Sequence, residues 1–312
     1  MAVVSIGVPV YNGEKYIAET LDSLLAQSLT DFEIVVSDNA STDRTAEICR
    51  SYQKKDPRIR YFRNDRNIGA APNFNRVVEL AAAPLVHCGA CDDLYHPRFL
   101  ERCVEALARD PGLVLSYPRT TMIDESGTPM LFDRERNCFL DSYGDFLMTP
   151  VPAYIATGAS PETRFRDVLW PMGWCLPLSG VIRKAALLRT SLYRNYYGAD
   201  KVLLAELALQ GRFFQVDEDL FRKRVHRDGT HYKSTRERAR HEFGGAVGIP
   251  PQMKMLRDYV NMVFAAPLNA RQRMHCLFTI AGIACRRDVW RRLLIPGRDN
   301  YWGLCFATRL SK

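Results

Sequence analysis

The first 120 residues alternate between short apolar runs and amphipathic stretches. The apolar runs are rich in β-branched residues and predict buried strands, and the stretches between them carry apolar residues at helical spacing. Strands that alternate with helices of this length form parallel sheets with right-handed crossovers, so the pattern predicts an α/β fold. The predicted strands are residues 3–10, 32–37, 59–62, 85–88 and 113–117.

The remainder of the chain is less regular. Residues 139–178 hold several prolines and no clear period, and the last seventy residues are predicted to be helical and basic. Between them we predict a strand at 179–182, a helix at 200–210 and short strands at 213–216 and 220–225.

Polar residues follow four successive predicted strands. They are Tyr11, Asp38, Asn67 and Asp92. Ligands of open α/β sheets bind outside the carboxyl ends of the strands, so we expect these side chains to share one site.

An acidic pair, Asp92-Asp93, closes the loop after residues 85–88. Two adjacent carboxylates at a strand end need a partner for their charge, and hard divalent cations bind carboxylates together with substrate phosphates. The pair therefore favours metal-assisted phosphate or diphosphate chemistry. The alternative is two exposed loop acids that cap the following helix.

The net charge of +8 favours anionic partners. Basic residues gather at 222–240 and 286–292, without the interleaved aromatic residues of an RNA-recognition module, so no nucleic-acid partner is expected. The odd number of cysteines, nine, and a start that enters a strand pattern directly lead us to expect reduced thiols and a cytoplasmic location.

The ordered set of motifs resembles family 2 glycosyltransferases of the GT-A fold. The resemblance covers roughly the first 120 residues and extends to two later motifs. Its segments are 8–12, 35–43, 67–69, 92–93, 198–200 and 224–226. It implies a Rossmann-like, mostly parallel sheet flanked by helices, with a helical C-terminal extension. The expected domains are 1–235, with a nucleotide-sugar half (1–120) and an acceptor half (121–235), followed by a basic helical extension (236–312).

The resemblance also implies an inverting transfer of a sugar from a nucleotide diphosphate sugar to an acceptor hydroxyl. Asp92 and His226 match metal-contacting positions for Mg²⁺ or Mn²⁺, and Asp200 matches the general base. A UDP-sugar is the donor expected first, with Asp38 on the base. The other expected donor contacts are Pro9, Tyr11, Glu14, Asn67, Gly69, Asn73, Asp93 and Arg224.

Two positions depart from the family pattern. Ala90 and Ala199 stand where many members carry an acid, which leaves the metal dependence and the donor open. Structural roles also remain open: Asp38 and Asp200 suit helix N-termini, and His226 suits a packing role. A catalytically degenerate nucleotide-sugar or glycan binder is therefore one alternative, and a sugar nucleotidyltransferase is another. The latter would want a glycine-rich phosphate loop that residues 9–13 lack.

The acceptor is expected to be a glycan, a lipid-linked molecule or a small molecule. Trp170 and Trp174 lie in the irregular middle, where aromatic faces could stack on sugars or simply pack in the core. The basic C-terminal helices suit peripheral contact with the inner face of a membrane, packing on the catalytic domain or a homodimer contact.

Overall fold

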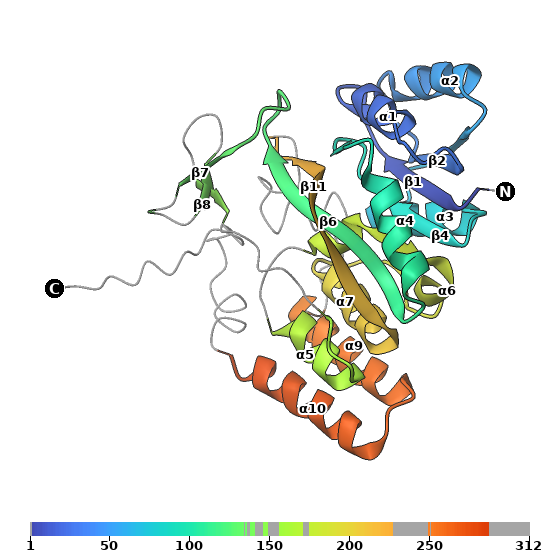
Figure 1. Ribbon diagram of the computed structural model, residues 1–312. Helices are drawn as coiled ribbons and strands as arrows, with labels where there is room; N and C mark the ends of the chain where they lie inside the picture. The colour runs from blue at the N-terminus through green and yellow to red at the C-terminus, as the bar shows by residue number, and fades with distance from the viewer. Residues whose placement is uncertain are drawn as a thin grey trace.

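The computed structural model describes residues 2–133, 135, 138–140, 146–148, 156–170, 175–226, 249 and 251–286 (Figure 1). Its centre is an eight-stranded sheet in the order β3-β2-β1-β4-β10-β6-β11-β5. The strands are β1 (Val4–Val10), β2 (Phe32–Asp38), β3 (Ile59–Arg63), β4 (Leu85–Cys88), β5 (Leu94–Tyr95), β6 (Leu113–Ile123), β10 (Val181–Arg183) and β11 (Arg212–Arg224).

The sheet is mostly parallel. β1 pairs in parallel with β2 and β4, β2 with β3, and β6 with β11. β10 lies antiparallel between β4 and β6, and β5 is an antiparallel edge strand beside β11. The predicted α/β fold is confirmed. Some details differ. The stretches predicted at 213–216 and 220–225 lie in one strand, β11, which ends at Arg224 and has register shifts near Asp219. The strand predicted at 179–182 spans Val181–Arg183, and β5 was not predicted because two residues give no period.

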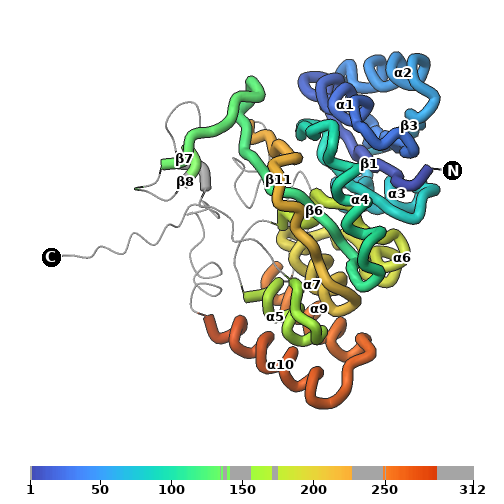
Figure 2. Tube along the Cα trace, in the orientation of Figure 1, coloured from blue at the N-terminus to red at the C-terminus, as the bar shows by residue number. Residues whose placement is uncertain are grey.

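Helices cover both faces of the sheet (Figures 1 and 2). They are α1 (Ile17–Leu25), α2 (Thr45–Lys55), α3 (Ala70–Leu80), α4 (Phe99–Arg109), α5 (Pro161–Leu169), α6 (Lys184–Leu187), α7 (Ala199–Gln210), α9 (Pro251–Ala265) and α10 (Ala270–Ala284). A 3₁₀ turn spans Leu176–Ser179, and the short strands β7 (Leu131–Asp133), β8 (Cys138–Leu140) and β9 (Phe146–Met148) form a second sheet.

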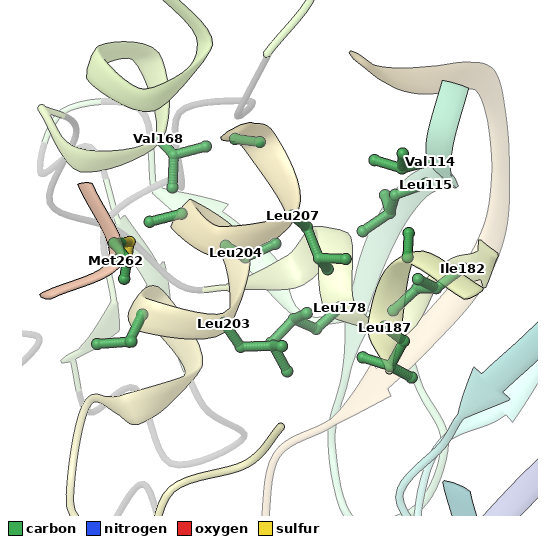
Figure 3. Packing of buried hydrophobic residues seen from close by; sticks show 14 of the residues in the cluster. Val114, Leu115, Val168, Leu178, Ile182, Leu187, Leu203, Leu204, Leu207 and Met262 are labelled. Atoms are coloured by element: carbon green, nitrogen blue, oxygen red, sulfur yellow. The ribbon is translucent and has the colours of Figure 1, made fainter. Parts of the chain in front are cut away.

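The core lies on both faces because successive strand residues point to opposite sides. In β2, Ile34 and Val36 join the cluster that packs under α1 and α4, whereas Val35 joins the cluster on the opposite face. In that second cluster Leu203, Leu204 and Leu207 of α7 pack among side chains of β6, β10, α5 and α9 (Figure 3). The sheet is therefore buried on both faces, and its strand ends face the site.

The helices α9 and α10 pack as a hairpin against α5 and α7. Tyr259, Met262, Cys276 and Ile280 join the same apolar cluster as the α7 leucines. The domain boundaries expected from the sequence stay a prediction. Among the described residues no helix is both long and apolar enough to cross a bilayer.

Candidate functional site

The carboxyl ends of β1, β2 and β3 lie in register. Val10 is opposite Asp38, and Asp38 is opposite Arg63. Backbone hydrogen bonds continue between the strands past these ends. Asn39 N–H donates to Val10 O, and Asn64 N–H donates to Asp38 O, both at 2.8 Å. The loops after the three strands are therefore held together, as the parallel sheet predicts.

Asp38 lies completely buried at the end of β2. Its Oδ1 accepts from Ser41 N–H at 2.8 Å, and its Oδ2 accepts from Tyr61 Oη at 2.6 Å and from Arg63 Nη1 at 3.0 Å. The carboxylate thus organises the loop that begins α2. The predicted contact with a donor base stays a prediction, and Tyr61 and Arg63 cover the oxygen that would make it.

Tyr11 is the exposed aromatic residue of this edge, with 47% of its surface accessible, whereas Pro9 is buried within β1. Glu14 is exposed, and its Oε2 accepts from Arg44 N–H at 2.8 Å where α2 begins. Of these three predicted donor contacts, Tyr11 alone presents a large flat surface to solvent. Glu14 links the loop after β1 to the start of α2, and Pro9 lies within β1 just before that loop.

The predicted contacts Asn67 and Gly69 form the turn before α3. Asn67 is exposed, and its Oδ1 accepts from Asn39 Nδ2 at 2.7 Å and from Gly69 N–H at 2.9 Å. Gly69 precedes the helix with φ of 92°, a left-handed conformation that favours glycine. The turn therefore presents the N-terminus of α3 at the same edge as Asp38.

Asn73 lies below this turn and only 2% of it is exposed. Its Nδ2 donates to Ser37 O at 2.9 Å, and its Oδ1 accepts from Ser37 Oγ at 2.7 Å and from Asn64 Nδ2 at 3.1 Å. The amide is occupied by protein partners. In this structure Asn73 therefore supports the loops at the sheet edge and does not itself face the place of a donor.

Asp92 and His226 meet at the same edge of the sheet. β11 runs parallel to β6 and β6 runs in the direction of β4, so the chain after β11 reaches the loop after β4. Asp92 Oδ2 lies 3.0 Å from His226 Nε2. The side chains are 25% and 12% exposed, and no atom of the described residues pairs with the buried His226 Nδ1. The structure thus joins the two predicted metal contacts.

Asp93 is buried beneath Asp92. Its Oδ1 accepts from Arg224 N–H at 2.9 Å, and its Oδ2 lies 3.6 Å from Lys223 Nζ. Burial raises the pKa of Asp93 to about 6; the charge of Lys223 opposes this rise and that of Asp92 adds to it. Asp93 therefore holds β11 next to the Asp92 loop through Arg224 and Lys223. Its expected contact with the donor stays a prediction.

Arg224 requires a correction. The sequence suggested a phosphate contact, but the side chain is buried, with 2% of the residue exposed. Its Nε donates to Asp92 O at 2.8 Å, Nη1 donates to Glu125 O at 2.9 Å, and Nη2 pairs with Glu19 Oε2 at 2.6 Å. Its guanidinium also lies over the Tyr16 ring. Arg224 is an internal brace for the Asp92 loop and has no surface to offer a phosphate.

Asp200 lies in the first turn of α7, after Gly198 in a left-handed conformation with φ of 85°. It is exposed to solvent, yet burial by the surrounding protein raises its pKa, and Lys223 opposes this shift. The two observations agree if the carboxylate is open on one side and surrounded on the others. An aspartate with a raised proton affinity suits the removal of a proton from a hydroxyl.

Lys223 is the residue whose importance the sequence did not single out. Burial alone would lower its pKa, but the charges of Asp93, Asp92 and Asp200 outweigh this effect and raise it. One cation thus acts on the predicted metal ligand, its buried neighbour and the predicted base. In the sequence Lys223 stood within a run of basic residues, where charge alone cannot distinguish an inward side chain from an outward one.

Trp170 ends α5 and 53% of its surface is exposed. Its N–H donates to Arg166 O within α5, and Arg286, just after α10, donates from Nη1 to its carbonyl at 3.0 Å. The other aromatic candidate, Trp174, and the basic residues at 227–240 lie outside the described residues.

Comparison with known proteins gives a consistent family. The model of glycosyl transferase family 2 matches residues 5–160. An uncharacterized glycosyltransferase of Methanocaldococcus jannaschii is 32% identical over 127 residues, 40% of this chain and 44% of that protein. Chondroitin synthase of Pasteurella multocida is 27% identical over 232 residues, 72% of this chain and 24% of the synthase. The chain therefore spans less than half of each of these relatives.

Two solved structures have similar folds. TarS 1–349 of S. aureus, in complex with UDP-GlcNAc, has a TM-score of 0.61 and 19% identity over 91% of this chain and 72% of that one. Mannosyltransferase PcManGT from Pyrobaculum calidifontis, in complex with GDP-Man and Mn²⁺, has a TM-score of 0.51 and 18% identity over 94% and 78%. At this level of identity the likeness concerns the fold.

Proposed function

The chain belongs to glycosyl transferase family 2, and from that premise we propose that it transfers a sugar from a nucleotide diphosphate sugar to an acceptor hydroxyl, with inversion at the anomeric carbon. The observation that carries the proposal is the pairing of Asp92 with His226 at the sheet edge that also presents Tyr11 and Asp38. A metal-and-diphosphate site and a nucleoside site would then lie at the ends of neighbouring strands.

The residues at this edge fit a divalent cation. Asp92 supplies carboxylate oxygen and His226 supplies imidazole nitrogen, both suitable for Mn²⁺ or Mg²⁺. Within the described residues no group of three or more His, Cys, Asp or Glu side chains could hold a metal. Two protein ligands leave coordination positions for the donor diphosphate, as is usual for Mg²⁺ with phosphate substrates. When bound, the cation would stabilise the negative charge of the leaving diphosphate.

The acceptor side is assigned to Asp200. Inversion by direct displacement needs a single carboxylate that takes the hydroxyl proton while the acceptor oxygen attacks. The raised pKa of Asp200 increases its proton affinity, and its exposure gives an acceptor access to it. Lys223 limits that rise, so the carboxylate remains available in its ionised form over a wider pH range.

A uridine nucleotide is the first donor to test. The buried Asp38 can accept from the N3–H of uracil if Tyr61 and Arg63 move aside, and Tyr11 offers a face for stacking. Two structural neighbours were solved with UDP-GlcNAc and with GDP-Man, so both nucleotide classes belong in the screen. The sugar and the acceptor are left to the experiment.

The test begins with a thermal-shift screen of uridine, guanosine and thymidine diphosphate sugars, with and without Mn²⁺. A ligand that binds only the folded state raises its melting temperature. Donor consumption is then measured for the wild type, Asp200→Asn and the control Asp217→Asn. Asp217 is a carboxylate on β11 whose side chain is 92% exposed. We expect donor binding in all three and a loss of turnover of roughly 10²-fold or more for Asp200→Asn alone.

Three results would argue against this proposal. If no donor shifts the melting temperature, the hypothesis of a nucleotide-sugar site is wrong. If Asp200→Asn has the same turnover as the wild type, Asp200 is not the general base. Donor binding without turnover in the wild type, both with and without Mn²⁺, would favour the non-catalytic binder.

A further inference from the structure

The helix α10 has two apolar faces. Its inner face, with Cys276, Ile280 and Ile283, is buried against the rest of the molecule. Its opposite face is also apolar in part: Met274 and Phe278 lie one turn apart and are 49% and 66% exposed. A helix that packs on a domain by one face alone would carry polar residues at the second one.

A further exposed apolar side chain lies on the neighbouring helix α9. Phe264, near the end of α9, is 60% exposed, and the guanidinium of Arg273 lies over its ring at 5.8 Å. Exposed residues recur at three- and four-residue spacing along α10 and at the residue after it. We call these residues, together with Phe264 of α9, the outer face: Arg271, Met274, Phe278, Ala281, Cys285 and Phe264. Figures 1 and 2 show α10 at the edge of the molecule farthest from α1 and α2.

The charge around the outer face has one sign. Residues 251–286 contain Lys254, Arg257, Arg271, Arg273 and Arg286, and a single acid, Asp258. That acid is 1% exposed and accepts from Tyr196 Oη at 2.5 Å. Arg194 Nη1 lies 3.3 Å from it and Arg257 Nε lies 3.2 Å from it. The solvent-facing charge of the hairpin is therefore positive throughout.

We propose that the outer face of α9 and α10 rests on an anionic lipid surface. Exposed large apolar side chains on a hairpin that also exposes Arg257 and Arg271 match the boundary between lipid headgroups and acyl chains. A second copy of this chain fits less well, because a two-fold contact would bring Arg271 and its neighbours against the same cations of the partner. The inference is independent of the proposed sugar transfer.

The test is sedimentation of the full chain with vesicles. Vesicles of phosphatidylcholine alone are compared with vesicles that contain about 30% phosphatidylglycerol, at low and at high salt. The main variant is Met274→Glu with Phe278→Glu, and Arg271→Glu is tested separately because it leaves the apolar residues intact. Leu188→Glu is the matched control: Leu188 is 54% exposed and follows α6, away from the outer face. Melting temperatures establish that each variant folds.

We expect the wild type and Leu188→Glu to sediment with anionic vesicles and much less with neutral ones, with binding weakened by salt. The double variant should bind at least about tenfold more weakly because it loses apolar burial and gains repulsion. Arg271→Glu should weaken binding at low salt alone. Equal binding by the double variant and the wild type would overturn the proposal. So would absence of vesicle binding, or a wild-type dimer in sedimentation equilibrium that the double variant abolishes.

Discussion

Asp92 Oδ2 lies 3.0 Å from His226 Nε2, although 134 positions separate the two residues in the sequence. Two links hold them: Arg224 Nε donates to Asp92 O, and Arg224 N–H donates to Asp93 Oδ1. The strand that carries Arg224 also pairs with β5, directly after the acidic pair. Two side chains fixed in this way would lose little conformational entropy on binding the proposed cation.

The first prediction concerns metal affinity. His226→Gln removes the imidazole nitrogen and should weaken Mn²⁺ binding by roughly 100-fold, the upper range for changes around a metal site. The measurement is the Mn²⁺ concentration at half-maximal donor consumption, together with calorimetric titration of Mn²⁺ in the presence of a nucleoside diphosphate.

The matched control is His96→Gln, since His96 is an exposed histidine before α4. It should keep the wild-type Mn²⁺ affinity. If His226→Gln also keeps it while folding normally, His226 is not a metal ligand and its contact with Asp92 is structural.

The second prediction concerns the contribution of the buried Arg224 to stability. Arg224→Met leaves Glu19, Asp92 O and Glu125 O without their donor and should lower the free energy of unfolding by about 3–5 kcal/mol. Urea denaturation measures the loss. Arg222→Met, two residues earlier in the same strand and exposed, should change the free energy by less than about 0.5 kcal/mol. Equal effects of the two changes would contradict the internal role of Arg224.

Hydrophobic period and turn residues were enough to predict where β1–β4 and β6 lie along the chain and the edge at which Asp38 and Asp92 lie, because both depend on local patterns. The order of the strands within the sheet, with β10 between β4 and β6, was not predicted. The role of Arg224 could not be predicted in this way. Arginine suits both phosphate binding and buried ion pairs, and only the register of β11 against β5 shows which one this position adopts.

The same limit applies to polar residues at loops. Asn67 and Asn73 both follow β3, and the family resemblance assigned both to the donor. In the structure Asn67 is exposed, whereas Asn73 lies on the buried side of α3 and binds Ser37. The side of the helix follows from its packing on β1 and β2, which involves residues distant in sequence.

The third prediction tests a close approach in the sheet. A Cβ at Gly180 would lie 2.2 Å from the backbone oxygen of Ser116, which a rigid strand cannot move away. Gly180→Ala should therefore destabilise the protein by about 1–3 kcal/mol or more. Gly282→Ala is the control: its Cβ would lie 3.5 Å from Trp170 within helix α10, and it should stabilise by up to about 1 kcal/mol. Thermal denaturation of both variants checks the opposite signs.

The fourth prediction concerns the stability of the Asp200 variant. A carboxyl whose pKa is higher in the folded than in the unfolded state contributes stability at low pH, and that contribution is lost as pH rises through the two pKa values. Burial raises the pKa of Asp200 in the folded state. Asp200→Asn should therefore keep or raise the melting temperature at neutral pH while turnover falls. A lower melting temperature would show that the ionised carboxylate stabilises the fold.

The last prediction uses Lys223 to test the identity of the base. Burial raises the pKa of Asp200 and the charge of Lys223 lowers it, so Lys223→Met should raise this pKa further. The acidic limb of kcat/KM against pH should then move to higher pH, because the base acts only when ionised. Lys223→Arg retains the charge and should restore the limb. A lysine that merely supports Asp93, 3.6 Å away, would reduce the rate at every pH without moving the limb. An unmoved limb would show that Lys223 does not influence the pKa of the base, and it would argue against Asp200 as that base.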